Sequence, residues 1–189
     1  MASVSPMVSI RAAFDPFQDR LCRDIRNDLS QGLMAVLRSA EIGGLDSTVA
    51  RYRARSLDPV QSDYLDERLA RYQRVLAEIK TAWISKDDTY GIAVLLWDQG
   101  LFFEVHEWLE AKWLVAGGPE KKLLQALIRA AGTYVHLGAG RLDGAQKMAC
   151  RAVSTLTALK AMVPGVIDVD LLIAKLTVLD PVPPKFGRR

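Results

Sequence analysis

Cysteine and histidine are scarce in this sequence. Among 189 residues there are two cysteines, Cys22 and Cys150, and two histidines, His106 and His136. The cysteines lie far apart in the chain, each within a segment of helical periodicity. Two such residues do not make a disulfide framework, so we expect free thiols in a reducing cytoplasm.

Long apolar runs and an excess of one charge are also missing. No uninterrupted apolar stretch approaches the roughly 20 residues that cross a bilayer, and the first residues lack the basic start and apolar run of a secretory signal. The 25 basic and 22 acidic side chains leave a net charge of +3 and are evenly spread. This balance gives no support to a membrane or nucleic-acid partner. We therefore expect a cytoplasmic protein.

Half of the residues are hydrophobic, and along most of the sequence they recur with the period of a helix. After Pro59 the apolar residues are spaced 4, 3, 4, 3 and 4 apart, which forms one continuous stripe on a helix. The pairs Asp15-Pro16, Asp58-Pro59 and Gly118-Pro119 each resemble a helix start, with a capping residue before a proline. We expect helices over residues 15–40, 59–83, 88–98, 101–115, 120–137, 142–162 and 168–179, with a short helix over 48–55.

No segment alternates with period two, so the predicted fold class is all-α: a helical bundle of about six to seven helices, built around two consecutive helical hairpins. We expect a helical extension over residues 1–86 that packs on the same core. Residues 87–162 form the double hairpin, whose turns resemble those of tetratricopeptide hairpins without the full repeat pattern. Residues 163–189 hold a short helix and a proline-rich tail, either loose or packed as an extended strap.

One part of the chain resembles a known family. The runs GLFFEVHEWLEAKW and LLQALIRAAGTYVHLGAGRLDGA are similar to the bacterial and archaeal domain-of-unknown-function 309 family over about residues 88–160. The resemblance implies a compact helical bundle and no established reaction. The matching positions are Gly100, Phe103, Glu104, His106, Glu107, Glu110, Trp113, Gln125, Leu127, Ile128, His136, Gly140, Gly144 and Ala145.

The candidate functional residues fall inside this segment. On a helix from residue 101, His106 and Glu110 lie one turn apart beside a broad apolar face, so we expect both to be partly buried. A buried carboxylate needs a partner, and for Glu110 we favour Gln125 or His106 itself. Counted along the helix axes, His136 lies about 9 Å further from the turn than His106. The candidate polar site is His106, Glu107, Glu110, Gln125 and His136.

Three functions are compatible with this group. His106 and Glu110, with Glu107 or His136, could bind a divalent metal such as zinc, iron or manganese. Glu110 or Glu107 could instead act as a base beside His106 in a small-molecule site, with hydrolysis as one use. We favour a third function, without enzymatic activity or cofactor, in which the group is a polar seam that fixes helix pairing beside a surface for a protein partner or a homo-oligomer.

Two further groups of residues have simpler predictions. Arg68, Arg71 and Arg74 lie off the apolar stripe that follows Pro59, and we expect them to form a solvated face. The four tryptophans occur at helical spacing, and we expect a place in the core or an interface, not a ligand cage. They are Trp83, Trp97, Trp108 and Trp113.

Overall fold

The computed structural model describes residues 13–39 and 43–187, and within them it contains eight α-helices, one 3₁₀ turn and no strand. The all-α prediction is confirmed, although eight helices form where six to seven were expected. Their bounds are α1 Arg20–Ser39, α2 Gly43–Arg53, α3 Pro59–Thr81, α4 Thr89–Asp98, α5 Phe102–Val115, α6 Gly118–Gly138, α7 Leu142–Ala158, the 3₁₀ turn Lys160–Met162 and α8 Val169–Thr177.

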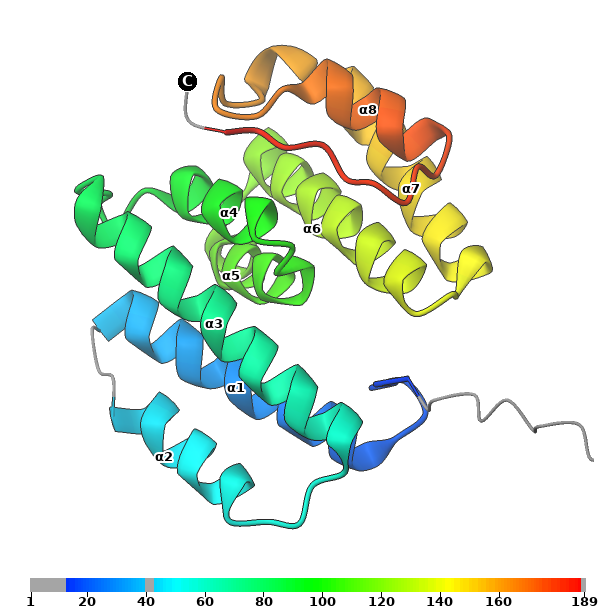
Figure 1. Cartoon of the computed structure of the whole chain (residues 1–189). Helices are drawn as coiled ribbons and strands as arrows, with labels where there is room; N and C mark the ends of the chain where they lie inside the picture. The colour runs from blue at the N-terminus through cyan, green and yellow to red at the C-terminus, as the bar shows by residue number, and fades with distance from the viewer. Residues whose placement is uncertain (1–12, 40–42, 188–189) are drawn as a thin grey trace, which may run out of the picture.

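The helices stack largely in chain order, so most contacts join neighbours in sequence (Figure 1). Helix α4 packs on α5, α5 on α6, α6 on α7 and α7 on α8. The first three helices join this stack at one place, because α1 packs against α5 and α3 packs against α4. The junction between α1, α3 and α5 is therefore where the N-terminal helices meet the rest of the chain.

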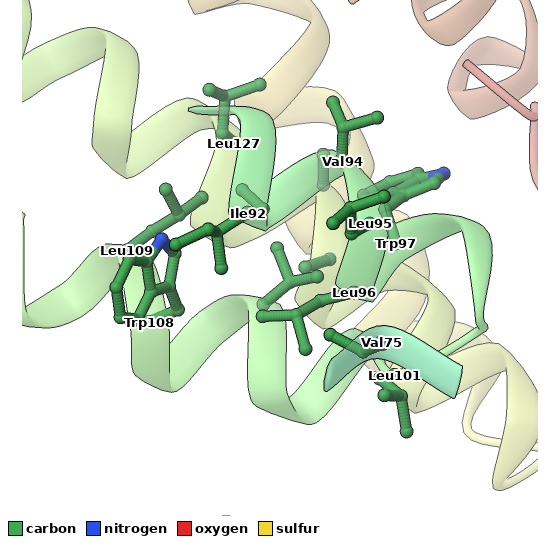
Figure 2. Close-up of a cluster of buried hydrophobic side chains, with 14 of the residues drawn as sticks. Val75, Ile92, Val94, Leu95, Leu96, Trp97, Leu101, Trp108, Leu109 and Leu127 are labelled. Atoms are coloured by element: carbon green, nitrogen blue, oxygen red, sulfur yellow. The ribbon is translucent and has the colours of Figure 1, made fainter. Parts of the chain in front are cut away.

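Helix α4 lies at the centre of the core. All seven residues from Gly91 to Trp97 are buried, so this helix has no solvent face along that stretch. Such a helix must be surrounded by others, and its side chains meet residues from α3, α5 and α6 (Figure 2). Val105 and Leu109, on the apolar face of α5, are buried in the same cluster.

Of the three helix starts predicted at proline pairs, two are confirmed. Asp58 forms a capping box with Gln61 at the start of α3, and Pro119 lies in the first turn of α6. The start at Asp15-Pro16 is wrong, because α1 begins only at Arg20. The Asp15 carboxylate accepts from the amide of Phe17 in a turn, and Asp19 accepts from the Cys22 amide and caps the helix instead.

Helix α2 corresponds to the short helix expected over residues 48–55, but it starts earlier. The expected start lay at residue 48, yet α2 begins at Gly43 and includes Gly44. Leu45 explains the early start: it is buried, and it packs so closely on Gly32 of α1 that a β-carbon there would touch the backbone of Leu45. Burial of this leucine outweighs the low helix propensity of two glycines.

Of the two states predicted for the proline-rich C-terminal tail, the structure shows the packed, extended strap. It runs back beside α8 towards α4 (Figure 1). The Trp97 indole N–H donates to the carbonyl of Pro184 over 2.8 Å. The Asp98 carboxylate accepts from the amides of Phe186 and Gly187 over 3.0 and 2.8 Å. These bonds fix the tail across the end of α4.

Two findings bear on the compartment predictions. Cys22 is buried and Cys150 is exposed, and both are free thiols as expected. Within residues 13–39 and 43–187, none of the helices combines the length and the apolar character that a membrane span requires.

Candidate functional site

A buried carboxylate lies at the junction of the N-terminal helices with the rest of the chain. Glu104 of α5 is 0% exposed, although both of its neighbours on the helix face, Leu101 and Val105, are apolar. The Tyr72 hydroxyl of α3 donates to Glu104 Oε1 over 2.6 Å, and Arg68 Nη1 of the same helix donates to Oε2 over 3.2 Å. Each carboxylate oxygen thus has a donor, which is the condition for burying a charge.

The electrostatics of this group follow from burial and from the ion pair. Burial alone would lower the pKa of Arg68, but the adjacent Glu104 carboxylate raises it above its ordinary value. Burial and the same carboxylate raise the pKa of Tyr72 well above its ordinary value. At neutral pH both groups are therefore protonated donors, and the group holds one full ion pair away from solvent.

The arginines of α3 do not form the solvated face that the sequence predicted. The Arg68 side chain is 17% exposed because it reaches Glu104. Arg71 donates to the carbonyl of Gln99 over 3.0 Å, just before α5. Arg74 is exposed and donates to the Gln99 side chain. The prediction is wrong for Arg68 and Arg71, which attach α3 to α5 and to the loop before it.

Beside the ion pair lies a partly open cavity of about 350 Å³. Its walls come from the segment before α1, from α1, α3 and α5, from the end of α6 and from the tail. The residues that line it are Phe14, Pro16, Phe17, Arg26, Tyr64, Arg68, Gly100, Phe102, Phe103, Tyr134, Val135, Leu137, Gly138, Ala139 and Pro181. Arg26 and Arg68 are the charged members of this set, so the cavity has a cationic end and aromatic walls.

Three polar groups around the cavity have unused hydrogen-bonding capacity. Arg26 forms no ion pair among the described residues, and its guanidinium lies 3.9 Å from the centroid of the Phe103 ring. The Tyr134 hydroxyl is buried and has no hydrogen-bond partner in the described chain. Burial raises the pKa of Tyr134 to about 12, so the hydroxyl keeps its proton. The guanidinium of Arg68 gives one N–H to Glu104 and has further donors.

The segment before α1 closes one side of the cavity. The ring of Phe14 stacks on Tyr64 with centroids 3.5 Å apart, and Phe17 packs on His136 of α6 at 5.1 Å. Arg23 holds the turn between them, because it donates to the carbonyls of Pro16 and Phe17 over 3.1 Å each. This wall is made of side chains from a non-helical segment, which is the part of a site that can move without unpacking helices.

Three of the five predicted site residues lie together on α5. His106, Glu107 and Glu110 are half-buried, and each offers one possible ligand atom within 4.8 Å of the others. The His106 Nδ1 lies 3.2 Å from Glu107 Oε1. No hydrogen bond joins Glu110 to Gln125 in the part of the chain that the structure describes, so Gln125 does not act as the expected partner of Glu110.

His136 has a separate environment. Its ring packs on Phe17 and against Gly144 of α7, where a β-carbon would overlap the imidazole. Its Nδ1 is buried and has no partner among the described residues. Burial, followed by the charge of Arg141, lowers the pKa of His136. This histidine is therefore neutral at physiological pH and belongs to the packing between α6, α7 and the first segment.

Glu104 and Arg68 were not among the predicted site residues, yet their spacing holds a signal. From Leu101, which caps the start of α5, the buried residues Glu104, Val105 and Trp108 follow at i+3, i+4 and i+7. Glu104 therefore occupies an apolar-face position. On α3, Arg68 holds the same i+3 position after the buried Leu65. A charged residue at a core position of each of two helices indicates that the two charges pair.

Comparison with known proteins gives one match. Residues 91–148, just under a third of the chain, match the family described as Domain of unknown function (DUF309). No curated protein and no solved structure matches the chain. The matched segment runs from α4 into α7 and includes Glu104 and the His106 cluster, which confirms the resemblance predicted from the sequence. Residues 91–148 are thus similar to the DUF309 family.

Proposed function

We propose that this protein binds a small organic anion in the cavity between its N-terminal helices and its DUF309 segment. The observation that carries the proposal is the set of polar groups there. In the described chain Arg26 lies in the wall without a carboxylate partner. The buried Tyr134 hydroxyl has no hydrogen-bond partner there. An unpaired cation and an unpaired donor beside a cavity supply what an anion needs.

The size and composition of the cavity agree with a ligand site. Its volume of about 350 Å³ falls in the range of roughly 300–1,000 Å³ that small-molecule pockets occupy. Six of its fifteen lining residues are aromatic, and its two arginines lie on α1 and α3. This is the usual division between an apolar body and a few orienting polar groups.

A thermal-shift screen of anionic, neutral and cationic metabolites tests the proposal. A ligand at one hundred times its Kd stabilises the fold by about 2.7 kcal/mol, which raises Tm by roughly 5–10 °C for a chain of this size. We expect anions to produce such shifts in the wild type and in Arg20→Gln, and not in Arg26→Gln. Arg20 is the matched control, because it lies on the same helix with a side chain that is 91% exposed.

Tyr134→Phe adds a second, independent test. The substitution removes a hydroxyl that has no partner in the described chain, so the free protein should be as stable as the wild type or more so. The anion-induced shift should nevertheless fall. If neutral or cationic compounds stabilise the protein and anions do not, or if Arg26→Gln keeps the full shift, the proposal is wrong.

A metal-binding function of the α5 cluster is a second candidate. It is favoured by the proximity of His106, Glu107 and Glu110, whose ligand atoms lie within 4.8 Å of one another. Imidazole and carboxylates suit zinc or manganese. Titration of Zn²⁺ against a chromophoric chelator should show one site in the wild type and in His136→Gln, and no site in His106→Gln. Equal binding by all three proteins would exclude this cluster.

The expected protein partner or homo-oligomer stays a prediction, supported by exposed apolar side chains. Trp83 is 93% exposed, and Leu114 and Val115 are 65% and 81% exposed. Large apolar side chains on the surface often mark contact sites. Light scattering should then give a mass above 20.9 kDa, and Trp83→Ser should reduce it if this residue is in the contact.

A further inference from the structure

Of the two cations in the cavity wall, Arg68 forms an ion pair and Arg26 forms none in the described chain. Arg26 and Arg68 are the charged residues in this wall. The Arg68 guanidinium is paired with the Glu104 carboxylate. Of the nearby carboxylates, Glu67 pairs with Arg71, and the charges of Glu104 and Glu107 act on Arg26 without forming an ion pair with it. Since one of the two guanidinium groups is already paired with a carboxylate, the wall favours a ligand with a single negative charge over a dianion.

The geometry of the cations favours a flat acceptor group. Arg26 lies with its guanidinium over the Phe103 ring at 3.9 Å, and its Nε and Nη2 donate to Asn27, which leaves Nη1 without a hydrogen bond in the described chain. Arg68 lies over the Tyr64 ring at 4.9 Å and gives Nη1 to Glu104. A planar carboxylate matches the edge of a guanidinium that is stacked on a ring.

The remaining walls offer planar faces to the body of the ligand. Phe102 and Tyr134 stack with centroids 5.1 Å apart. Phe14 stacks on Tyr64 from the segment before α1 and belongs to the same cavity. Aromatic rings favour offset stacking or edge contacts with other rings, so a flat aromatic group fits these walls better than a flexible polar chain.

We infer that the ligand is a monocarboxylate with a flat aromatic body, its carboxylate towards Arg26 and Arg68 and its rings among the phenyl groups. The inference rests on the proposed anion-binding function and narrows it to one chemical class. In this arrangement the Tyr134 hydroxyl donates to a polar atom of the ligand, which satisfies a buried group that is otherwise unpaired.

Isothermal titration with four probes tests the class of ligand. The probes are naphthalene-2-carboxylate, 2-naphthyl phosphate, naphthalene-2-methanol and acetate. We expect the carboxylate to bind most tightly, the alcohol and the phosphate ester at least tenfold more weakly, and acetate not at all. Arg26→Gln should weaken the carboxylate by about 10- to 100-fold, the usual effect of a charge-assisted hydrogen bond, and leave the alcohol unchanged. Arg20→Gln should behave as the wild type.

The outcomes separate the class of ligand from the proposed function. If 2-naphthyl phosphate binds more tightly than the carboxylate and still depends on Arg26, the monocarboxylate inference is overturned while anion binding stands. If acetate binds as well as naphthalene-2-carboxylate, the aromatic body is overturned. If the alcohol equals the carboxylate, or if no probe binds, both the inference and the proposed function fail.

Discussion

The ion pair between Arg68 and Glu104 is testable by a double-mutant cycle. Glu104→Leu removes the carboxylate and leaves the buried guanidinium and the Tyr72 hydroxyl without their acceptor. Arg68→Met leaves a carboxylate that is 0% exposed with the tyrosine as its remaining donor. The double variant replaces the pair with apolar side chains of similar length.

The expected magnitudes follow from the burial of each partner. Breaking a buried ion pair typically costs about 3–5 kcal/mol. Arg68 is 17% exposed and Glu104 is not exposed. We therefore expect about 3 kcal/mol for Glu104→Leu and about 4 kcal/mol for Arg68→Met. The double variant should lose about 2 kcal/mol and not about 7, because the unpaired Tyr72 hydroxyl is then the main remaining penalty.

Urea unfolding followed by far-UV circular dichroism measures this coupling. With a denaturant slope of about 3 kcal/mol/M, a coupling of about 5 kcal/mol places the midpoint of the double variant about 1.7 M above the additive expectation. The slope should be the same in all four proteins. If the two substitutions are additive within about 0.5 kcal/mol, the pair does not join α3 to α5 and the reasoning about the junction fails.

Three further predictions concern other contacts. Burial lowers the pKa of His136 in the folded protein below its value of 6.5 in the unfolded chain. Between these two pKa values the unfolded form binds more protons, so the free energy of unfolding should fall as the pH drops from 6.5 towards the folded pKa. His136→Gln should flatten this pH dependence in thermal unfolding. Gly144→Ala should cost about 1–3 kcal/mol in urea unfolding, since the added methyl group overlaps the imidazole, and Gly165→Ala, with open space around it, should not. Asp98→Ala removes the acceptor of two tail amides and should make trypsin cut after Lys185 several-fold faster, whereas Asp98→Asn should keep most of the protection.

The helices could be predicted from the sequence because their signals are local. The period of the stripe on α3 and the capping box at Asp58 involve residues within one or two turns. Helix starts failed where a tertiary contact or a competing cap decided them. Leu45 draws Gly43 and Gly44 into α2 by packing on α1, and Asp19 caps α1 in place of Asp15.

The candidate site was less predictable because its parts come from distant positions. His106, Glu107 and Glu110 share one helix, and their proximity follows from its period. Arg68 and Glu104 are 36 residues apart, and their pairing depends on how α3 crosses α5. Each charge occupies a core position of its own helix, which suggests burial without naming the partner. The cavity depends on six segments at once, so no single stretch of sequence indicates it.

A crystal structure of the protein with naphthalene-2-carboxylate tests the central claim most directly. We expect the ligand in the cavity beside α1, α3 and α5, with a carboxylate oxygen about 3 Å from a nitrogen of Arg26 or Arg68 and the rings among Phe14, Phe102 and Phe103. A ligand bound elsewhere on the protein, or one in the cavity with its carboxylate turned away from both arginines, would contradict it.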